Sequence, residues 1–205
     1  MNKTSAIKKL RQRFNRYRDR QEYTKGINLL RKGLEKYPND KEILSMSAEL
    51  LDKRGIKNKN KPDFKESEKI YDQLIKKHPQ YNAGYFGKIR FLIRRKDKRA
   101  FVLAKKYIKI SNDKAYNMYI GHCYRDFGDF KNAEKFYLIA YKHVKNHYGP
   151  DYALATLYAE MGNRVKAKKY AERGIKKWQK MPIRYRKSSL TKKFIKELKQ
   201  IINTK

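Results

Sequence analysis

The chain has 205 residues, of which 54 are Lys or Arg and 20 are Asp or Glu, giving a formal net charge of +34. Apolar residues make up 40% and aromatic residues 13%, which excludes a disordered basic tail, because such tails lack residues that form a core. A single cysteine excludes a disulfide framework, and no spacing typical of a zinc site occurs. No apolar run approaches the roughly 18 residues of a membrane span, and the basic segment 1–9 is not followed by the apolar stretch of a secretion signal. We therefore expect a soluble, cytoplasmic protein.

The positive charge is concentrated towards the two ends of the chain. Residues 1–36 contain 12 basic and 3 acidic side chains, and residues 164–205 contain 16 basic and 2 acidic ones. A biased nucleotide composition would enrich Lys, but it would also supply Glu, which normally balances Lys on helix surfaces. We interpret the excess as a selected basic surface, which attracts anionic partners.

The spacing of apolar and small residues predicts helix–turn–helix segments over about 114–147 and 148–181. Weaker matches to the same offsets extend the pattern to about 5–38, 41–79 and 82–110, which gives five segments, numbered here in chain order. The second segment contains the polar stretch 55–62, which we expect to be a mobile loop. After Pro182, residues 184–203 are predicted to form one amphipathic helix that caps the end of the array. No Gly-rich or Ser-rich linker divides these segments, so we expect one continuous domain over residues 1–205.

The fourth and fifth segments repeat each other with a period of 34 residues. Gly128 and Asp129 align with Gly162 and Asn163, and Gly suits the left-handed position after a helix while Asp or Asn caps the next one. Small residues at helical spacing let the two helices of a pair approach closely. The other matched residues are Ile120, Gly121, Tyr124, Ala133, Tyr137 and Ala140, which align with Leu154, Ala155, Tyr158, Ala167, Ala171 and Gly174.

With this period and these small and aromatic positions, the chain resembles the tetratricopeptide-repeat (TPR) family over nearly its whole length. The resemblance implies an all-α fold, a right-handed superhelical solenoid of about five helix–turn–helix repeats with a C-terminal capping helix. In such a solenoid the first helix of each pair lines a concave surface. TPR proteins typically bind extended peptides or partner helices on that surface.

Residues that could carry catalysis have a structural interpretation in this pattern. Cys123 lies mid-helix with no base assigned to it. His143 and His147 share one helix face, but we expect the following Gly-Pro pair to break the helix before Asp151 and so to leave no metal site. The Asp-Phe-Gly triplet at 126–128 lacks the other motifs of a kinase. We expect no enzymatic activity, no metal, no cofactor and no small-molecule substrate.

One TPR subclass binds a C-terminal carboxylate through a Lys-x-x-x-Asn pair, a further Asn and a Lys-x-x-x-Arg pair. Arg11 and Asn15 match the first pair in part, with Arg in place of Lys. Glu49, with Asp52 nearby, lies where an Asn or a basic residue is needed, and it would repel a carboxylate. We therefore do not expect this chain to be a carboxylate clamp.

We expect instead a groove of basic and aromatic side chains on the first helices, because Arg binds carboxylates and phosphates bidentately. Its candidate contact residues are Arg11, Asn15, Arg18, Arg90, Arg94, His122, Arg125 and Tyr152. A separate basic patch on the second helices and the tail suits nonspecific attraction to phosphate backbones. Its main residues are Lys166, Lys169, Arg173, Lys176, Lys177, Arg184, Arg186 and Lys187.

The favoured function is a non-catalytic TPR adaptor that binds an acidic protein or peptide, with its basic charge steering association. Nucleic-acid binding is the alternative, since helical repeats can follow a phosphate backbone and tyrosines can stack on bases. A further alternative is an accessory role in the synthesis of an anionic cell-surface polymer. Residues 7–20 form a basic amphipathic helix that could contact a membrane surface, but its apolar stripe is needed to pack the first repeat.

Overall fold

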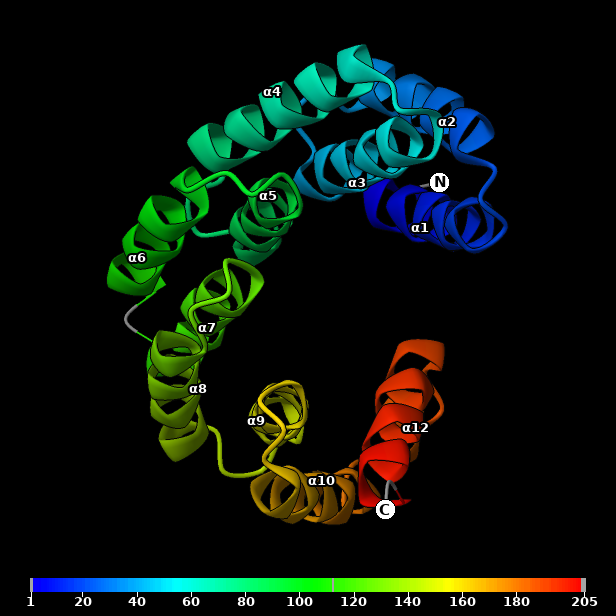
Figure 1. Cartoon of the computed structure of the whole chain (residues 1–205). Coiled ribbons are helices and arrows are strands. Elements are labelled where there is room, and N and C mark those ends of the chain that lie inside the picture. The colour runs from blue at the N-terminus through cyan, green and yellow to red at the C-terminus, as the bar shows by residue number, and fades with distance from the viewer. Residues whose placement is uncertain (1, 112, 204–205) are drawn as a thin grey trace. The chain divides into compact units, whose positions relative to one another are not determined.

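The computed structural model of the chain describes residues 2–111 and 113–203, without the side chains of Arg184 and Ser189. Within these ranges the regular structure is entirely helical (Figure 1). Contacts divide the chain into two compact units, Met1–Leu103 and Ala104–Lys205, called here the N-terminal unit and the C-terminal unit.

The N-terminal unit contains two complete helical hairpins and the start of a third. Its helices are α1 (Lys3–Asp19), α2 (Tyr23–Lys36), α3 (Lys41–Asn58), α4 (Lys61–Lys77), α5 (Asn82–Arg94) and the beginning of α6 (Arg99–Ser111). Helix α3 packs against its hairpin partner α4 and also against α1 and α5, the first helices of the neighbouring hairpins (Figure 1). The core of the unit contains Ile27, Leu30, Ile43, Leu50 and Leu51, which are at most 1% exposed, together with the buried rings of Phe14 and Phe91. Full burial of each such side chain contributes about 1.5–3 kcal/mol.

The C-terminal unit continues the same arrangement from the second half of α6. Its helices are η1 (Lys114–Tyr116), α7 (Asn117–Asp126), α8 (Phe130–His143), α9 (Gly149–Glu160), α10 (Arg164–Gln179), α11 (Ile183–Arg186) and α12 (Ser189–Asn203). Helix α9 contacts α7, α10 and α12. Ile195 and Leu198 of α12 cover the buried Ala155 and Ala171, so α12 caps the last hairpin.

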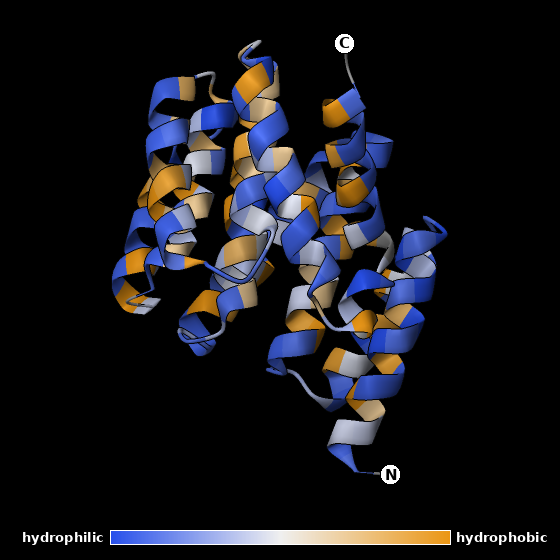
Figure 2. Cartoon of the chain, turned by 90° about the horizontal axis from the view of Figure 1, so that it is seen from below, coloured by the Kyte–Doolittle hydropathy of each residue, from blue (hydrophilic) through white to orange (hydrophobic). Residues whose placement is uncertain are grey.

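The expected all-α fold of five helix–turn–helix repeats with a C-terminal capping helix is therefore confirmed. In both units the first helices of successive hairpins are neighbours, and the surface that they form is called here the first-helix face. Individual helices carry both hydrophobic and hydrophilic residues (Figure 2), as helices with one buried face do. No helix in the described ranges is both long and apolar enough to cross a membrane.

The turns within the hairpins use a left-handed residue, as the repeat pattern predicts. Gly128 and Gly162 have φ of 83° and 73°, and the side chains of Asp129 and Asn163 then accept hydrogen bonds from backbone N–H groups of α8 and α10. The corresponding turn before α6 contains no glycine, and Lys96 adopts φ of 53° there. A left-handed conformation costs a residue with a side chain roughly 1–2 kcal/mol.

The prediction of a loop over residues 55–62 is wrong. Helix α3 continues to Asn58 and α4 begins at Lys61. Gly55 is buried under the ring of Phe64, where a Cβ would collide with it, and this packing extends α3. Lys59 then ends the helix in the left-handed conformation, with its N–H bonded to the Gly55 carbonyl.

Two expectations near the C-terminus also need correction. Residues 184–203 do not form one helix, because α11 ends at Arg186 and α12 begins at Ser189. The Ser188 carbonyl accepts the bond from Lys192 N–H at 2.9 Å that starts the new helix. Moreover, His143 and His147 do not share a helix face, because α8 ends at His143 and α9 begins only at Gly149, with Pro150 in its first turn, where proline is well tolerated.

Candidate binding groove of the N-terminal unit

Helices α3 and α5 border a groove on the first-helix face of the N-terminal unit, with a cavity volume of about 270 Å³. Two of the predicted contact residues, Arg90 and Arg94, line it from α5. The other lining residues are Ser45, Glu49, Asp52, Lys53, Ile56, Tyr71, Ala83, Phe86 and Gly87. Residues 45, 49 and 53 of α3, and residues 86, 90 and 94 of α5, are each four apart, so each set lies on one helix face.

Asp52 balances part of the positive charge at this groove. Its side chain is 2% exposed and forms ion pairs with Arg94 and, at 2.8 Å, with Arg95. The Arg95 guanidinium lies 3.6 Å and 4.0 Å from the ring centroids of Phe91 and Phe64, which holds it in place. The Asp52 carboxylate, buried between two arginines, holds both guanidinium groups in place. Arg94 is therefore engaged in a contact within the protein.

Three charged side chains remain available in the groove. Arg90 and Lys53 form no ion pair with any residue in the described ranges, and neither does Glu49. Ile56 is 49% exposed and, with Phe86, supplies apolar surface. The groove can therefore offer cations to a carboxylate, an acceptor to an N–H donor, and apolar contact between them.

Tyr71 forms part of the groove wall. Its side chain is 3% exposed, and its ring rests on Gly87, where a Cβ would collide with it. Burial, followed by the nearby negative charges of Asp52 and Glu49, raises the pKa of the Tyr71 hydroxyl. The phenol therefore stays neutral at physiological pH and acts as a packing group.

The remaining predicted residues of the N-terminal unit lie on α1 and do not line this groove. Arg11 forms an ion pair with Glu42 of α3. Arg18 pairs with Asp19 at 3.1 Å, and its guanidinium lies 5.2 Å from the ring centroid of Phe14. Asn15 is half-buried. Arg11 and Arg18 thus serve contacts within the unit.

The three predicted contact residues of the C-terminal unit also have internal partners. His122 Nδ1 lies 2.7 Å from the hydroxyl of Tyr137. Arg125 donates from Nε to Glu160 at 2.8 Å, and this carboxylate raises the pKa of the guanidinium. Tyr152 donates to Glu197 of α12. These bonds join neighbouring helices.

Much of the predicted basic patch is exposed, but some of its residues are paired. Lys177 donates to the fully buried Asp151 at 2.6 Å, and Arg173 lies 3.8 Å from the same carboxylate. Lys166 lies 3.7 Å from Glu134. Lys169, Lys176 and Lys187 are exposed and Arg186 is half-buried, whereas the side chain of Arg184 lies outside the described residues.

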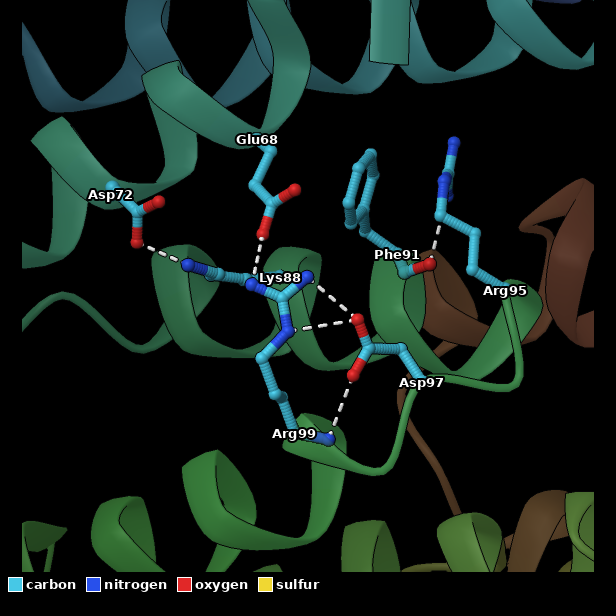
Figure 3. Close-up of polar contacts among 7 residues, drawn as sticks. All are labelled: Glu68, Asp72, Lys88, Phe91, Arg95, Asp97 and Arg99. Atoms are coloured by element: carbon cyan, nitrogen blue, oxygen red, sulfur yellow. Dashed lines mark hydrogen bonds and ion pairs between the residues drawn. The ribbon is translucent and has the colours of Figure 1, made fainter. Parts of the chain in front are cut away.

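Sequence reasoning missed the ion-pair network that joins α4 to α5 and the start of α6 (Figure 3). Arg99 binds Glu68 at 2.9 Å and Asp97 at 2.6 Å, and Lys88 pairs with Asp72. The bonds from Arg99 lower the pKa of the Asp97 carboxyl. Sequence reasoning also left Lys53 and Phe86 out of the groove, although their four-residue spacing from Glu49 and Arg90 was a usable signal.

Cys123, which was considered for catalysis, lies in α7 within the core of the C-terminal unit. Cys123 is fully buried, and burial raises the pKa of its thiol to about 12, so almost no thiolate forms at neutral pH. Within the described part of the chain, no three His, Cys, Asp or Glu side chains are arranged to hold a metal ion.

No protein-family model and no curated protein matches this sequence. Solved structures do match. A thermophilic TPR protein of Thermus thermophilus aligns over 97% of this chain and all of its own, with a TM-score of 0.69 and 18% identity. A TPR protein of Parabacteroides merdae aligns over 97% of this chain and 71% of its own, with a TM-score of 0.71 and 14% identity. MamA of Desulfovibrio magneticus aligns over 89% and 97%, with a TM-score of 0.55 and 15% identity. The chain therefore has the tetratricopeptide-repeat fold.

Proposed function

We propose that the chain is a non-catalytic helical-repeat scaffold that binds an acidic protein segment in the groove between α3 and α5. The observation that carries the proposal is the pair of available cations, Arg90 and Lys53, beside the exposed apolar surface of Ile56. An arginine without an internal partner can bind a carboxylate bidentately. An extended segment that carries acidic and apolar side chains fits this combination.

The acidic residues of the groove narrow the choice of partner. Glu49 disfavours a carboxylate at its own position and can accept a hydrogen bond from a backbone N–H or a basic side chain of the bound segment. The ion pair with the buried Asp52 holds the Arg94 guanidinium in place. A uniformly acidic polymer would therefore bind less well here than a peptide with separated acidic residues.

Selection from a random peptide library tests this proposal without assuming the identity of the partner. The immobilised full chain is used for selection, and an Arg90→Glu/Lys53→Glu variant is used to remove peptides that bind elsewhere. We expect the selected peptides to contain an acidic residue next to an aliphatic or aromatic one. Binding of a selected peptide should weaken about tenfold in Arg90→Ala, the loss of one charged hydrogen-bonding partner.

The matched control is Arg13→Ala, which removes an exposed arginine of α1 that has no ion pair in the described part of the chain. This variant should bind the selected peptide as the wild type does. Equal weakening in the two variants, or selection of basic peptides, would contradict the proposal.

A further inference from the structure

The C-terminal unit contains a second cavity, with a volume of about 830 Å³, that the groove proposal does not use. It lies between the connection from α8 to α9 and the end of α10 with the residues that follow. Its lining residues are Lys145, Asn146, His147, Lys177, Lys180, Met181, Pro182 and Tyr185. None of these residues is acidic, and a cavity of this volume can hold a nucleotide-sized group.

The lysines of the cavity provide positive charge that is largely uncompensated. Lys145 and Lys180 form no ion pair with any residue that the structure describes. Lys177 donates to Asp151 at 2.6 Å, and Asp151 has no exposed surface, so this carboxylate lies beneath the lysine and away from solvent. An anion entering the cavity meets ammonium groups first.

His147 adds a neutral donor. Its Nδ1 accepts a hydrogen bond from the Gly149 N–H at 3.0 Å, which leaves the proton of a neutral ring on Nε2. Its ring stacks on Tyr148 with 4.7 Å between centroids. Partial burial and the nearby charge of Lys177 lower the pKa of His147, in agreement with a neutral ring.

The surroundings of the cavity distinguish between kinds of anion. Tyr185 is 47% exposed, and an exposed ring offers a base a stacking surface. Exposed Lys169 and Lys176 continue the positive charge along α10, so a polymer with repeated charges fits better than an isolated ion. The cavity cations are lysines, which bind phosphates as point charges, whereas phosphopeptide sites are typically Arg clusters. We propose that this cavity holds a backbone phosphate of a single-stranded nucleic acid, with a base stacked on Tyr185.

Fluorescence anisotropy with a labelled oligouridine of about 12 nucleotides tests the phosphate contact, since this length lies within the usual site sizes of single-strand binders. The full chain is compared with Lys145→Ala/Lys180→Ala and with the control Lys105→Ala/Lys109→Ala, which removes two exposed lysines of α6 in the same unit. We expect the cavity variant to bind about tenfold more weakly. Its slope of log affinity against log salt should be shallower by about 0.7, because the cavity holds one phosphate and each phosphate contact on a single strand contributes about 0.7. The control should keep a slope close to that of the wild type.

The stacking contact is tested with Tyr185→Ala and Tyr185→Phe, using inorganic polyphosphate as a probe that lacks bases. Tyr185→Ala should weaken oligouridine binding about tenfold and leave polyphosphate binding unchanged, whereas Tyr185→Phe should behave as the wild type.

Three results would overturn the proposal: equal losses in the two lysine variants, equal effects of Tyr185→Ala on both probes, or tighter binding of a phosphoserine peptide than of oligouridine. Thermal unfolding of each variant, followed by circular dichroism, checks that the fold is retained.

Discussion

The cavities of the two units hold positive charge in different ways. In the N-terminal unit, Arg94 is bound to the buried Asp52, and Arg90 shares its groove with Glu49, so cations and acids alternate. In the C-terminal unit, lysines line a cavity without an acidic lining residue. Alternating charge favours a ligand with a matching pattern, whereas charge of one sign attracts anions more generally. The net charge of +34 therefore does not describe either cavity, and we propose that the two select different ligands.

The largest expected effect is the loss of stability when Asp52, the buried acid at the groove, is removed. Asp52→Ala leaves Arg94 and Arg95 without their shared carboxylate, and breaking a fully buried pair costs roughly 3–5 kcal/mol. Because both arginines are partly exposed, we expect a loss of about 2–3 kcal/mol, measured by urea unfolding. The control is Asp72→Ala, which removes the exposed partner of Lys88 and should cost about 0–1 kcal/mol. Similar losses in the two variants would show that the groove does not depend on Asp52.

A smaller effect is expected from the turns, which differ between the units. Gly128→Ala places a Cβ where no heavy atom lies within 4 Å, so its cost is conformational only, about 1–2 kcal/mol. Lys96→Gly relieves the same strain in the N-terminal unit and should stabilise it by up to about 1 kcal/mol. The control Lys98→Gly, at a residue without positive φ, should destabilise by about 0.5–1 kcal/mol. Thermal unfolding measures all three, and a destabilised Lys96→Gly variant would refute the interpretation.

The smallest expected effect concerns the buried acid of the C-terminal unit. Burial outweighs the attraction of Lys177 and raises the pKa of the Asp151 carboxyl above its ordinary value of 3.8. The native state then binds this proton more tightly than the unfolded state, so ionisation lowers stability as pH rises from about 3.8 through the raised pKa. Asn does not ionise, so Asp151→Asn does not lose stability in this way as pH rises. The stability of Asp151→Asn minus that of the wild type should therefore increase with pH across that window, as measured by urea unfolding. A decrease would mean that the ion pair with Lys177 dominates.

Most of the fold could be predicted because its signals are local. The Gly128 and Gly162 turns and their Asp129 and Asn163 caps follow from adjacent residues in the sequence. The period of 34 residues follows from comparing two consecutive segments of the sequence. The exceptions depend on tertiary packing. The polar stretch 55–62 is mostly helical because Phe64 covers Gly55, which no local pattern reports.

The candidate sites were less predictable, because a charged side chain on a first helix can face a ligand or a neighbouring helix. Arg11, Arg125 and Tyr152 each bind an acidic residue of another helix, 31 to 45 positions away in the sequence. Periodicity places such residues on a face but does not identify their partners. Arg90 lines the groove, but the lack of an ion pair to it within the described residues follows from the three-dimensional placement of the surrounding acidic side chains, which the sequence does not show.

The most direct test of two separate binding surfaces is one set of titrations with two ligands and two variants. A selected acidic peptide and the oligouridine are each titrated into Arg90→Glu and into Lys145→Ala/Lys180→Ala. We predict that Arg90→Glu loses affinity for the peptide alone, and that the lysine variant loses affinity for the oligouridine alone. If each variant weakened both ligands to the same extent, the basic charge would act as one undivided surface and the account would be contradicted.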